Sequence, residues 1–255
     1  MSTDDPWRPL IAELDGWKAR GQPALFWLRD DDAVVPSAAL DRLLDATGRF
    51  SIPLTLAVIP EKTGSLLTNA LDRWPHVSVA LHGWSHRNHA PSGQKNQELG
   101  PHRPIDEMLA ELHAGVGRLS RLHGARFVPL LVPPWNRIDP TLLPHLGGIG
   151  LSALSVFGPE QPGPIRSVNC HVDLIDWRGT RGGRDPATLI AEIIARLRGC
   201  GPGGGPVGVL THHLVHDEAA WGFLDELFAC TTQHPACRWV PIAEILADGS
   251  PATGR

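Results

Sequence analysis

The chain has 255 residues, of which 42% are hydrophobic, and a formal net charge of −4 at pH 7. This length suits one α/β barrel better than two domains, so we expect a single domain over 1–255 with its core at about 24–247. Charges of both signs are interspersed and no basic stripe occurs, which argues against a nucleic-acid partner.

The chain shows no targeting or membrane signal. Its first residues carry Asp4 and Asp5 instead of a basic region followed by an apolar one, and no apolar run is long enough to span a bilayer. The four cysteines lack C-x-x-C spacing and are expected to be reduced thiols. A cytoplasmic protein is the expectation. Nine Trp and no Tyr fit either core filling or a cleft with flat apolar walls that suits sugars.

Taken in order, hydrophobic periodicity predicts strand, loop and helix repeated about seven times. The predicted helices cover 7–20, 37–48, 65–73, 105–123, 139–146, 186–198 and 217–230. The predicted strands cover 24–28, 54–59, 77–81, 127–132, 151–156, 167–172 and 207–211, before a last strand and helix within 238–247. A polar loop covers 88–103 and a glycine turn 201–205. This order predicts parallel strands with helices outside, as a barrel or an open doubly wound sheet. No glycine-rich phosphate motif follows the first strand, which disfavours a dinucleotide-binding fold.

Polar clusters follow the predicted strands. They are Asp30–Asp32, His82–His86, Pro133–Arg137, Asp173–Arg178 and His212–Asp217. In a barrel, these clusters meet at the carboxyl-terminal mouth, where catalytic groups gather. Unpaired acids after a buried strand cost several kcal/mol, so the three aspartates indicate a compensating cation. The alternative is a cluster that caps the next helix.

His82 and His86 lie four residues apart, which on a helical turn places both imidazoles on one face. Neutral imidazole binds zinc and neighbouring first-row metals. The same spacing recurs at His212 and His216, so the pair indicates a metal site only together with other ligands. His216 and Asp217 have the simpler interpretation of capping the following helix.

With its motifs in this order, the chain resembles the polysaccharide deacetylase (carbohydrate esterase) superfamily over about 24–247. The resemblance implies a distorted (β/α)7 TIM-like barrel and a metal held by Asp-His-His. Aligning Asp31 and Asp32 with the family's acid pair makes Asp31 the general base and Asp32 a metal ligand; Asp30-Asp31 is the alternative register. The second motif is met by His82 and His86.

The later motifs match less closely. In the third, Trp135 keeps the aromatic position whose backbone N–H resembles an oxyanion donor, but the arginine that steers the base is missing. Arg137 or Arg29 is the candidate replacement. The fourth resembles Asp173-Leu174-Ile175-Asp176-Trp177, from which Asp176 or Asp173 is expected to orient the catalytic acid. In the fifth, Leu210-Thr211-His212-His213, His212 matches that acid and His213 replaces the usual Asp.

The resemblance implies a metal-dependent hydrolase that removes an acyl group, most simply acetyl, from an amino sugar or a related small amide or ester. One divalent ion is expected, zinc first, with Co, Mn, Ni or Fe as alternatives. Arg137, Trp84 and His213 are candidate substrate contacts, although Trp84 also suits packing and His213 a core hydrogen bond. A cytoplasmic precursor, such as a nucleotide-linked or lipid-linked sugar, is the expected substrate type.

Two other functions fit parts of the same pattern. One is a non-catalytic sugar- or metabolite-binding barrel, which the missing third-motif arginine favours. The other is a two-His-one-carboxylate iron oxygenase, against which the ligand order and the barrel argue. The oligomeric state is not readable from the sequence.

Overall fold

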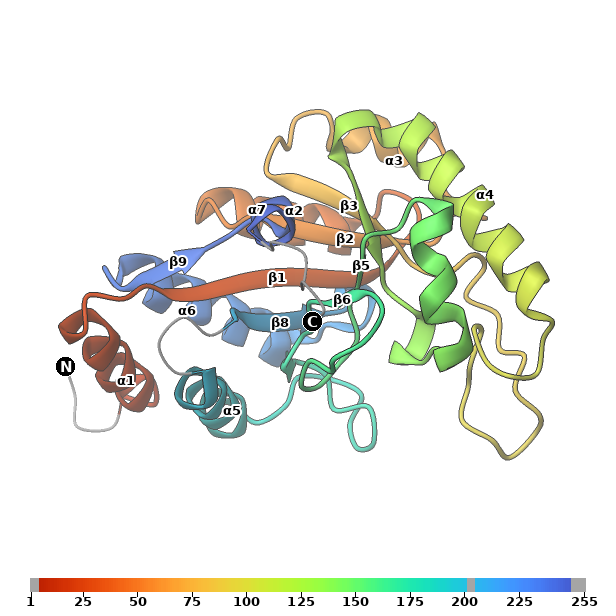
Figure 1. Cartoon of the computed structure of the whole chain (residues 1–255). Helices are drawn as coiled ribbons and strands as arrows, with labels where there is room; N and C mark the ends of the chain where they lie inside the picture. Colours follow the sequence, from red (N-terminus) through yellow and green to blue (C-terminus); the bar gives the residue numbers. More distant parts are fainter. Residues whose placement is uncertain (1–4, 201–204, 249–255) are drawn as a thin grey trace.

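The computed structural model describes residues 5–200 and 205–248, which form one parallel sheet surrounded by helices (Figure 1). The strands are β1 Ala24–Ala33, β2 Leu54–Val58, β3 Val77–Leu81, β4 Phe127–Leu131, β5 Ala153–Leu154, β6 Arg166–Ser167, β7 Val172–Asp173, β8 Val207–Thr211 and β9 Cys237–Trp239. Their order is β6-β5-β4-β3-β2-β1-β8-β7, and β9 pairs with the first residues of β1.

The segment 166–173 closes this sheet into a ring. Its first part, β6, pairs with β5, whereas its last part, β7, pairs with β8. Between them, the Cys170 N–H donates to the Val156 carbonyl at 3.0 Å and the His171 N–H donates to the Gly208 carbonyl at 2.7 Å. If β6 and β7 are counted as one broken strand, β1 to β8 form a barrel of seven strands. The predicted distorted (β/α)7 barrel is therefore confirmed.

The helices cover the ring unevenly. They are α1 Arg8–Ala19, α2 Ala38–Arg49, α3 Ser65–Leu71, α4 Ile105–His123, α5 Pro186–Cys200, α6 Glu218–Gln233 and α7 Ile242–Ala247. No α-helix lies between β4 and β7 in this fully described stretch. The helix predicted at 139–146 is instead the 3-10 helix η3, Pro140–Ile149, which contains Pro144. Proline inside a helix removes a backbone donor and clashes with the preceding turn, which explains the change.

Local capping and burial explain the regular helices. The Ser37 hydroxyl accepts the Leu40 N–H at 3.1 Å and begins α2, which buries Leu40, Leu43 and Leu44. A second, inner cluster fills the ring: Trp27 of β1, small residues such as Ala57 and Ala80, and Ile242 from α7. The interior of a narrow barrel has room for one large side chain only where its neighbours are small. This cluster meets that requirement because it combines Trp27 with alanines.

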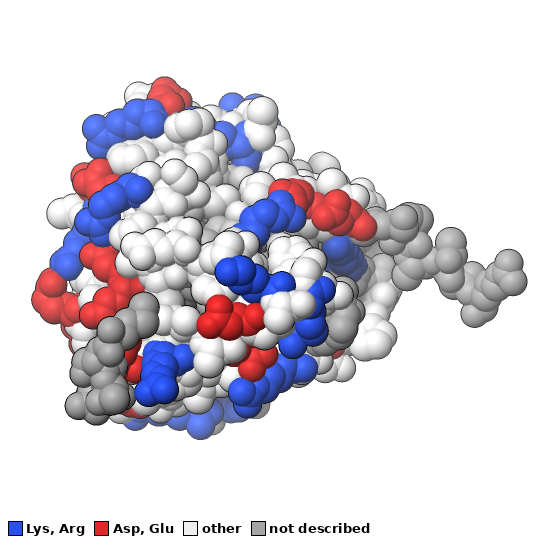
Figure 2. Space-filling model, turned by 90° about the vertical axis from the view of Figure 1, so that its left-hand side faces the viewer, with Lys and Arg blue, Asp and Glu red and all other residues white. Residues whose placement is uncertain are grey.

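Several predicted bounds need correction. The strand predicted at 24–28 continues as β1 through all three aspartates to Ala33, and the strand predicted at 167–172 is broken into β6 and β7. The predicted glycine turn lies largely outside the described residues. The loop 88–103 contains neither helix nor strand, as expected. Among residues 5–200 and 205–248, no helix is both long and apolar enough to cross a bilayer. The face in Figure 2 carries acidic and basic side chains side by side.

Candidate active site

The three consecutive aspartates of β1 have three different environments. Successive side chains of a strand point to opposite faces, so Asp31 shares the inner face with Arg29 while Asp30 points outward. Asp30 is fully buried, and its Oδ2 accepts the Thr211 hydroxyl at 2.7 Å and the His213 N–H at 2.9 Å. Burial raises the pKa of Asp30, but the charge and hydrogen bond of His213 lower it by more, so the pKa is below its usual value. Asp30 therefore anchors the segment after β8 rather than facing a substrate.

Asp32 departs from the alternating side-chain directions of the strand, and its side chain points toward the two histidines. Its φ of 72° lies in the left-handed region, which a non-glycine residue seldom adopts. This conformation brings its Oδ1 to 3.1 Å from Nε2 of His82 and 3.2 Å from Nε2 of His86. Burial raises the pKa of Asp32, but the hydrogen bond with His82 and the charges of both histidines bring it well below the usual range.

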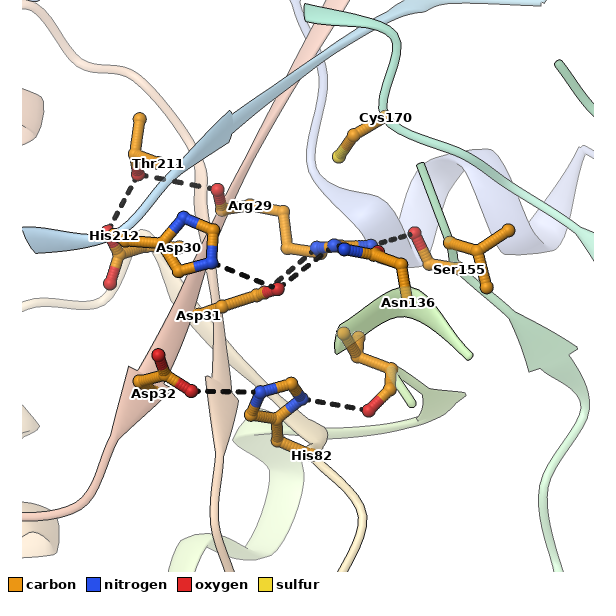
Figure 3. Close-up of polar contacts among 12 residues, drawn as sticks. Arg29, Asp30, Asp31, Asp32, His82, Asn136, Ser155, Cys170, Thr211 and His212 are labelled. Atoms are coloured by element: carbon orange, nitrogen blue, oxygen red, sulfur yellow. Dashed lines mark hydrogen bonds and ion pairs between the residues drawn. The ribbon is translucent and has the colours of Figure 1, made fainter. Parts of the chain in front are cut away.

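The donor chemistry of this cluster fits a divalent metal. Nδ1 of His82 lies 2.8 Å from the Val132 carbonyl, and the opposite ring nitrogen faces Asp32 (Figure 3). A carbonyl only accepts, so Nδ1 carries a proton and Nε2 is left to face Asp32. The ligand atoms of Asp32, His82 and His86 lie within 4.8 Å of one another. One carboxylate and two imidazole nitrogens converging in this way fit a divalent metal ion that keeps further positions open.

The segment that presents the histidines is not the helical turn we expected. Gly83 and His86 both have a φ of 57°, which interrupts any helix. The buried Glu98 holds the bend instead, because its carboxylate accepts the backbone N–H of Trp84 at 3.2 Å and of Ser85 at 2.7 Å. A Cβ at Gly83 would lie 2.1 Å from Glu98 Oε2, so this position requires glycine.

Asp31 is held by a buried arginine from its own strand. Nε of Arg29 lies 2.9 Å from Oδ1 of Asp31, and Nη2 donates to Oδ2 at 3.0 Å (Figure 3). The same guanidinium donates to Ser155 Oγ and to Asn136 Oδ1, each at 2.8 Å. Burial lowers the pKa of Arg29, but the charge of Asp31 more than offsets this. Arg29 therefore stays charged. Of the two candidate replacements for the missing arginine, Arg29 contacts Asp31, the predicted base, whereas Arg137 donates to the Asn96 carbonyl.

His212 faces Asp31 from the end of β8. Its Nε2 lies 3.8 Å from Oδ2 of Asp31, and its ring packs edge-on against Trp177, with centroids 4.7 Å apart. Asp173 lines the same cavity as His212, where burial raises its pKa and its carboxylate accepts the Ile175 N–H and the Trp177 indole N–H. Nδ1 of His212 has no hydrogen-bond partner among the described residues. Asp176 has other partners: it accepts the N–H groups of Gly179 and Thr180 and shapes a turn. Within the described chain, neither of the two candidates for orienting His212, Asp176 and Asp173, has a hydrogen bond to its imidazole, and the role stays a prediction.

The backbone around the site is unusual. Among the described residues, six non-glycine positions have positive φ, and five of them line one cavity of about 930 Å³. Those five are Asp32, His86, Trp135, Asn136 and Arg181. Such conformations cost about 1–3 kcal/mol each and concentrate at functional sites. The Trp135 ring also packs against His86, with centroids 4.2 Å apart.

The cavity gathers most, but not all, of the residues predicted from the sequence. Its walls include Asp31, Asp32, His82, His86, Trp135, Arg137, Asp176 and His212. Two predicted substrate contacts lie elsewhere. His213 is buried and bonded to Asp30 through Nδ1, so it makes the core hydrogen bond that was its alternative reading. Trp84 is half-buried outside the cavity walls because the bend held by Glu98 turns it away.

Solved structures with the same fold identify this architecture, although no protein-family model and no curated protein matches the sequence. A family 4 carbohydrate esterase from Streptomyces lividans, in complex with acetate, matches with a TM-score of 0.57 and 17% identity, over 92% of this chain and 95% of that chain. A family 4 acetyl xylan esterase from Clostridium thermocellum, in complex with a cobalt ion, matches with a TM-score of 0.57 and 16% identity, over 88% and 90%. This chain has the family 4 carbohydrate esterase fold. The predicted resemblance to polysaccharide deacetylases is thus confirmed for the fold.

The matches also include a mutant of BA3943, a family 4 pseudoenzyme, with a TM-score of 0.60 and 15% identity over 88% of this chain and 67% of that chain. The fold alone therefore does not decide between catalysis and binding, and the site residues carry that question.

Some site residues carry no sequence signal. Asn136, Ser155 and Glu98 occur in segments where such residues are common, and only the folded barrel brings them to the site. Arg29 is different, because its spacing of two from Asp31 on a strand places both on one face. Once β1 is known to continue through the aspartates, this spacing favours Arg29 over Arg137 as the arginine that contacts Asp31.

Proposed function

We propose that the protein is a metal-dependent hydrolase that removes an acyl group, most simply acetyl, from an amino sugar or a related small amide or ester. The observation that carries this proposal is the Asp32-His82-His86 cluster beside a base candidate, Asp31, which Arg29 fixes through both carboxylate oxygens. The fold shared with family 4 carbohydrate esterases supports the same chemistry.

Asp32, His82 and His86 are the residues that hold the ion, with zinc first and Co, Mn, Ni or Fe as alternatives. Cobalt is the ion in the complex of the Clostridium thermocellum esterase. When bound, the ion lowers the pKa of a water molecule and polarises the substrate carbonyl.

The chain's own residues divide the proton transfers. Asp31 takes the proton of the attacking water, and its bond to Arg29 keeps the carboxylate aimed at the cavity. His212, within 3.8 Å of Asp31, donates a proton to the leaving nitrogen or oxygen. The backbone N–H of Trp135 is the proposed donor to the developing oxyanion.

Metal analysis followed by acetate release from a panel of N- and O-acetylated sugars tests this proposal. Asp31→Asn should lower kcat by about a hundredfold or more while the bound metal stays stoichiometric. Asp72→Asn, an exposed acid outside the cavity walls, is the matched control and should keep full activity. Full turnover by Asp31→Asn shows that the base assignment is wrong.

A second candidate is a non-catalytic sugar- or metabolite-binding barrel. The match to a family 4 pseudoenzyme favours it, whereas the ion pair that Arg29 makes with Asp31 favours catalysis. Tight binding of an acylated sugar without any acetate release, in protein that holds its metal, selects the binding function.

A further inference from the structure

We propose that the substrate of this site carries a phosphate group, which Arg178 and Arg181 bind at the mouth of the cavity. This inference rests on the hydrolase function proposed above and adds the chemical class of its substrate. It starts from arginines that line the cavity together with the metal cluster but have no role in the acyl-transfer chemistry.

Four arginines line the cavity, and they differ in their partners. Arg184 is neutralised, because its Nη1 and Nη2 both donate to the carboxylate of Glu192. Arg137 donates to the Asn96 carbonyl, which leaves its charge uncompensated. Arg178 and Arg181 are exposed, and within residues 5–200 and 205–248 their guanidinium groups have neither an ion pair nor a hydrogen bond.

The acids of the same cavity are already engaged. Asp31 is paired with Arg29, Asp32 with the two histidines, and Glu192 with Arg184. Two further carboxylates accept backbone or indole N–H groups: Asp173 from Ile175 and Trp177, and Asp176 from Gly179 and Thr180. Neither Asp173 nor Asp176 has a cationic partner in the part of the chain that the structure describes, so both keep their charge. In the same part, the three guanidinium groups without an acidic partner, those of Arg137, Arg178 and Arg181, outnumber these two carboxylates, and the balance favours an anionic ligand.

The segment that carries Arg178 and Arg181 is held in place. Between β7 and α5, the Arg181 N–H donates to the Asp176 carbonyl at 2.9 Å and the Asp176 N–H donates to the Gly182 carbonyl at 2.9 Å. Gly183 donates to Asp217 Oδ1 at 3.0 Å, which ties the loop to the start of α6. Arg181 adopts a φ of 61°, a strained conformation that this network maintains.

The same loop connects the two arginines to the reacting end of the cavity. Trp177, next to Arg178, is 42% exposed and packs edge-on against the acid His212. Phe157, which precedes β6 in the chain, is 44% exposed and lines the same cavity. Two exposed aromatic side chains in the same cavity wall as the arginines suit a sugar ring that bears an anionic substituent.

Phosphate fits these arginines better than a carboxylate does. One guanidinium fork satisfies the two oxygens and single charge of a carboxylate. A phosphate offers further oxygens and up to two charges, so it can accept from Arg178 and Arg181 together, with Arg137 as a third cation. The structure therefore points to a phosphorylated or phosphodiester-linked acylated sugar rather than a neutral or carboxylated one.

Binding and turnover measured separately test this inference. Calorimetry on zinc-loaded protein would compare N-acetylglucosamine, its 1-phosphate and 6-phosphate, and N-acetylmuramic acid as the carboxylate probe. At least one phosphorylated sugar should bind about tenfold or more tighter than the neutral and carboxylated sugars. The double variant Arg178→Ala/Arg181→Ala should lose this preference. Arg8→Ala/Arg121→Ala, which removes two exposed charges outside the cavity walls, should keep it.

Three other results overturn the inference. They are equal affinity for neutral and phosphorylated sugars, tighter binding of the carboxylated sugar, and a phosphate preference that survives the loss of both arginines. Acetate release from the same compounds is scored independently. Arginine-dependent phosphate binding without acetate from any sugar supports the inference and contradicts the hydrolase proposal. Acetate release without a phosphate preference supports the hydrolase proposal and contradicts the inference.

Discussion

Arg29 and Asp31 stand two residues apart on β1, and the guanidinium of one binds both carboxylate oxygens of the other. The pair is buried, with 0% and 2% of each residue exposed, so solvent screens it little. A strand places such residues side by side on one face, so the cation that pairs with Asp31, the proposed base, comes from the same strand. Ser155 and Asn136 fix the far side of the guanidinium.

Arg29→Lys should lower kcat by about 10- to 100-fold with little change in KM, because one ammonium group cannot span both oxygens of Asp31 while also bonding Ser155 and Asn136. Steady-state kinetics at saturating zinc measures this, and metal content should remain unchanged. Arg121→Lys, an exposed position on α4, is the control. A rise in KM at constant kcat contradicts a positioning role for Arg29.

His82→Ala should weaken metal binding by more than about a hundredfold, because it removes one of three protein ligands. Chelator competition followed by metal analysis measures the affinity. His89→Ala provides a matched control, since His89 is exposed in the loop that follows the same motif. Equal metal affinity in both variants would contradict the assignment of Asp32, His82 and His86 as the metal ligands.

Gly83→Ala should destabilise the protein by about 3 kcal/mol or more, because a Cβ there adds overlap with Glu98 and Pro134 to the cost of a left-handed alanine. Gly93 separates these two effects. It also has a positive φ, of 83°, but a Cβ at Gly93 meets nothing within 4 Å, so Gly93→Ala should cost only about 1–2 kcal/mol. Denaturant unfolding of both variants gives the comparison, and equal losses contradict the packing argument.

His123 should make the protein less stable in mild acid. It is 5% exposed at the end of α4, and neither ring nitrogen has a hydrogen-bond partner within the described parts of the chain. Burial and the charge of Arg126 lower its pKa from 6.5 to about 4. The unfolded chain therefore binds more protons between these values, and stability falls as the pH drops from about 6.5 toward 4.

Between pH 7 and pH 5, this residue should account for a loss on the order of 1 kcal/mol, after allowing for partial solvent screening. Urea unfolding of chelator-treated protein at both pH values measures it. His123→Leu should reduce the loss, whereas His113→Leu, exposed on the same helix, should not. An unchanged pH dependence in His123→Leu shows that the ring is not buried neutral.

The sequence was most informative where a single segment determines the outcome. α4 and β8 have the predicted bounds because their apolar periodicity is uninterrupted. The Asp31-Asp32 register, by contrast, depends on Asp32 taking a left-handed conformation, which no local pattern indicates. Glu98 and Asn136 reach the site through loops folded back over a long sequence separation, so their contacts arise only from the tertiary structure.

The cavity residues fall into two groups along the chain, one near β1 and β3 and one around the broken strand formed by β6 and β7. The proposed metal ligands and base lie on β1 and directly after β3, where the strands are longer and helices cover them. Phe157, Trp177, Arg178 and Arg181 belong to the short-stranded side that has little helical cover. Substitutions at Phe157, Arg178 or Arg181 can therefore change the proposed ligand preference while Asp31, Asp32 and the two histidines keep their positions.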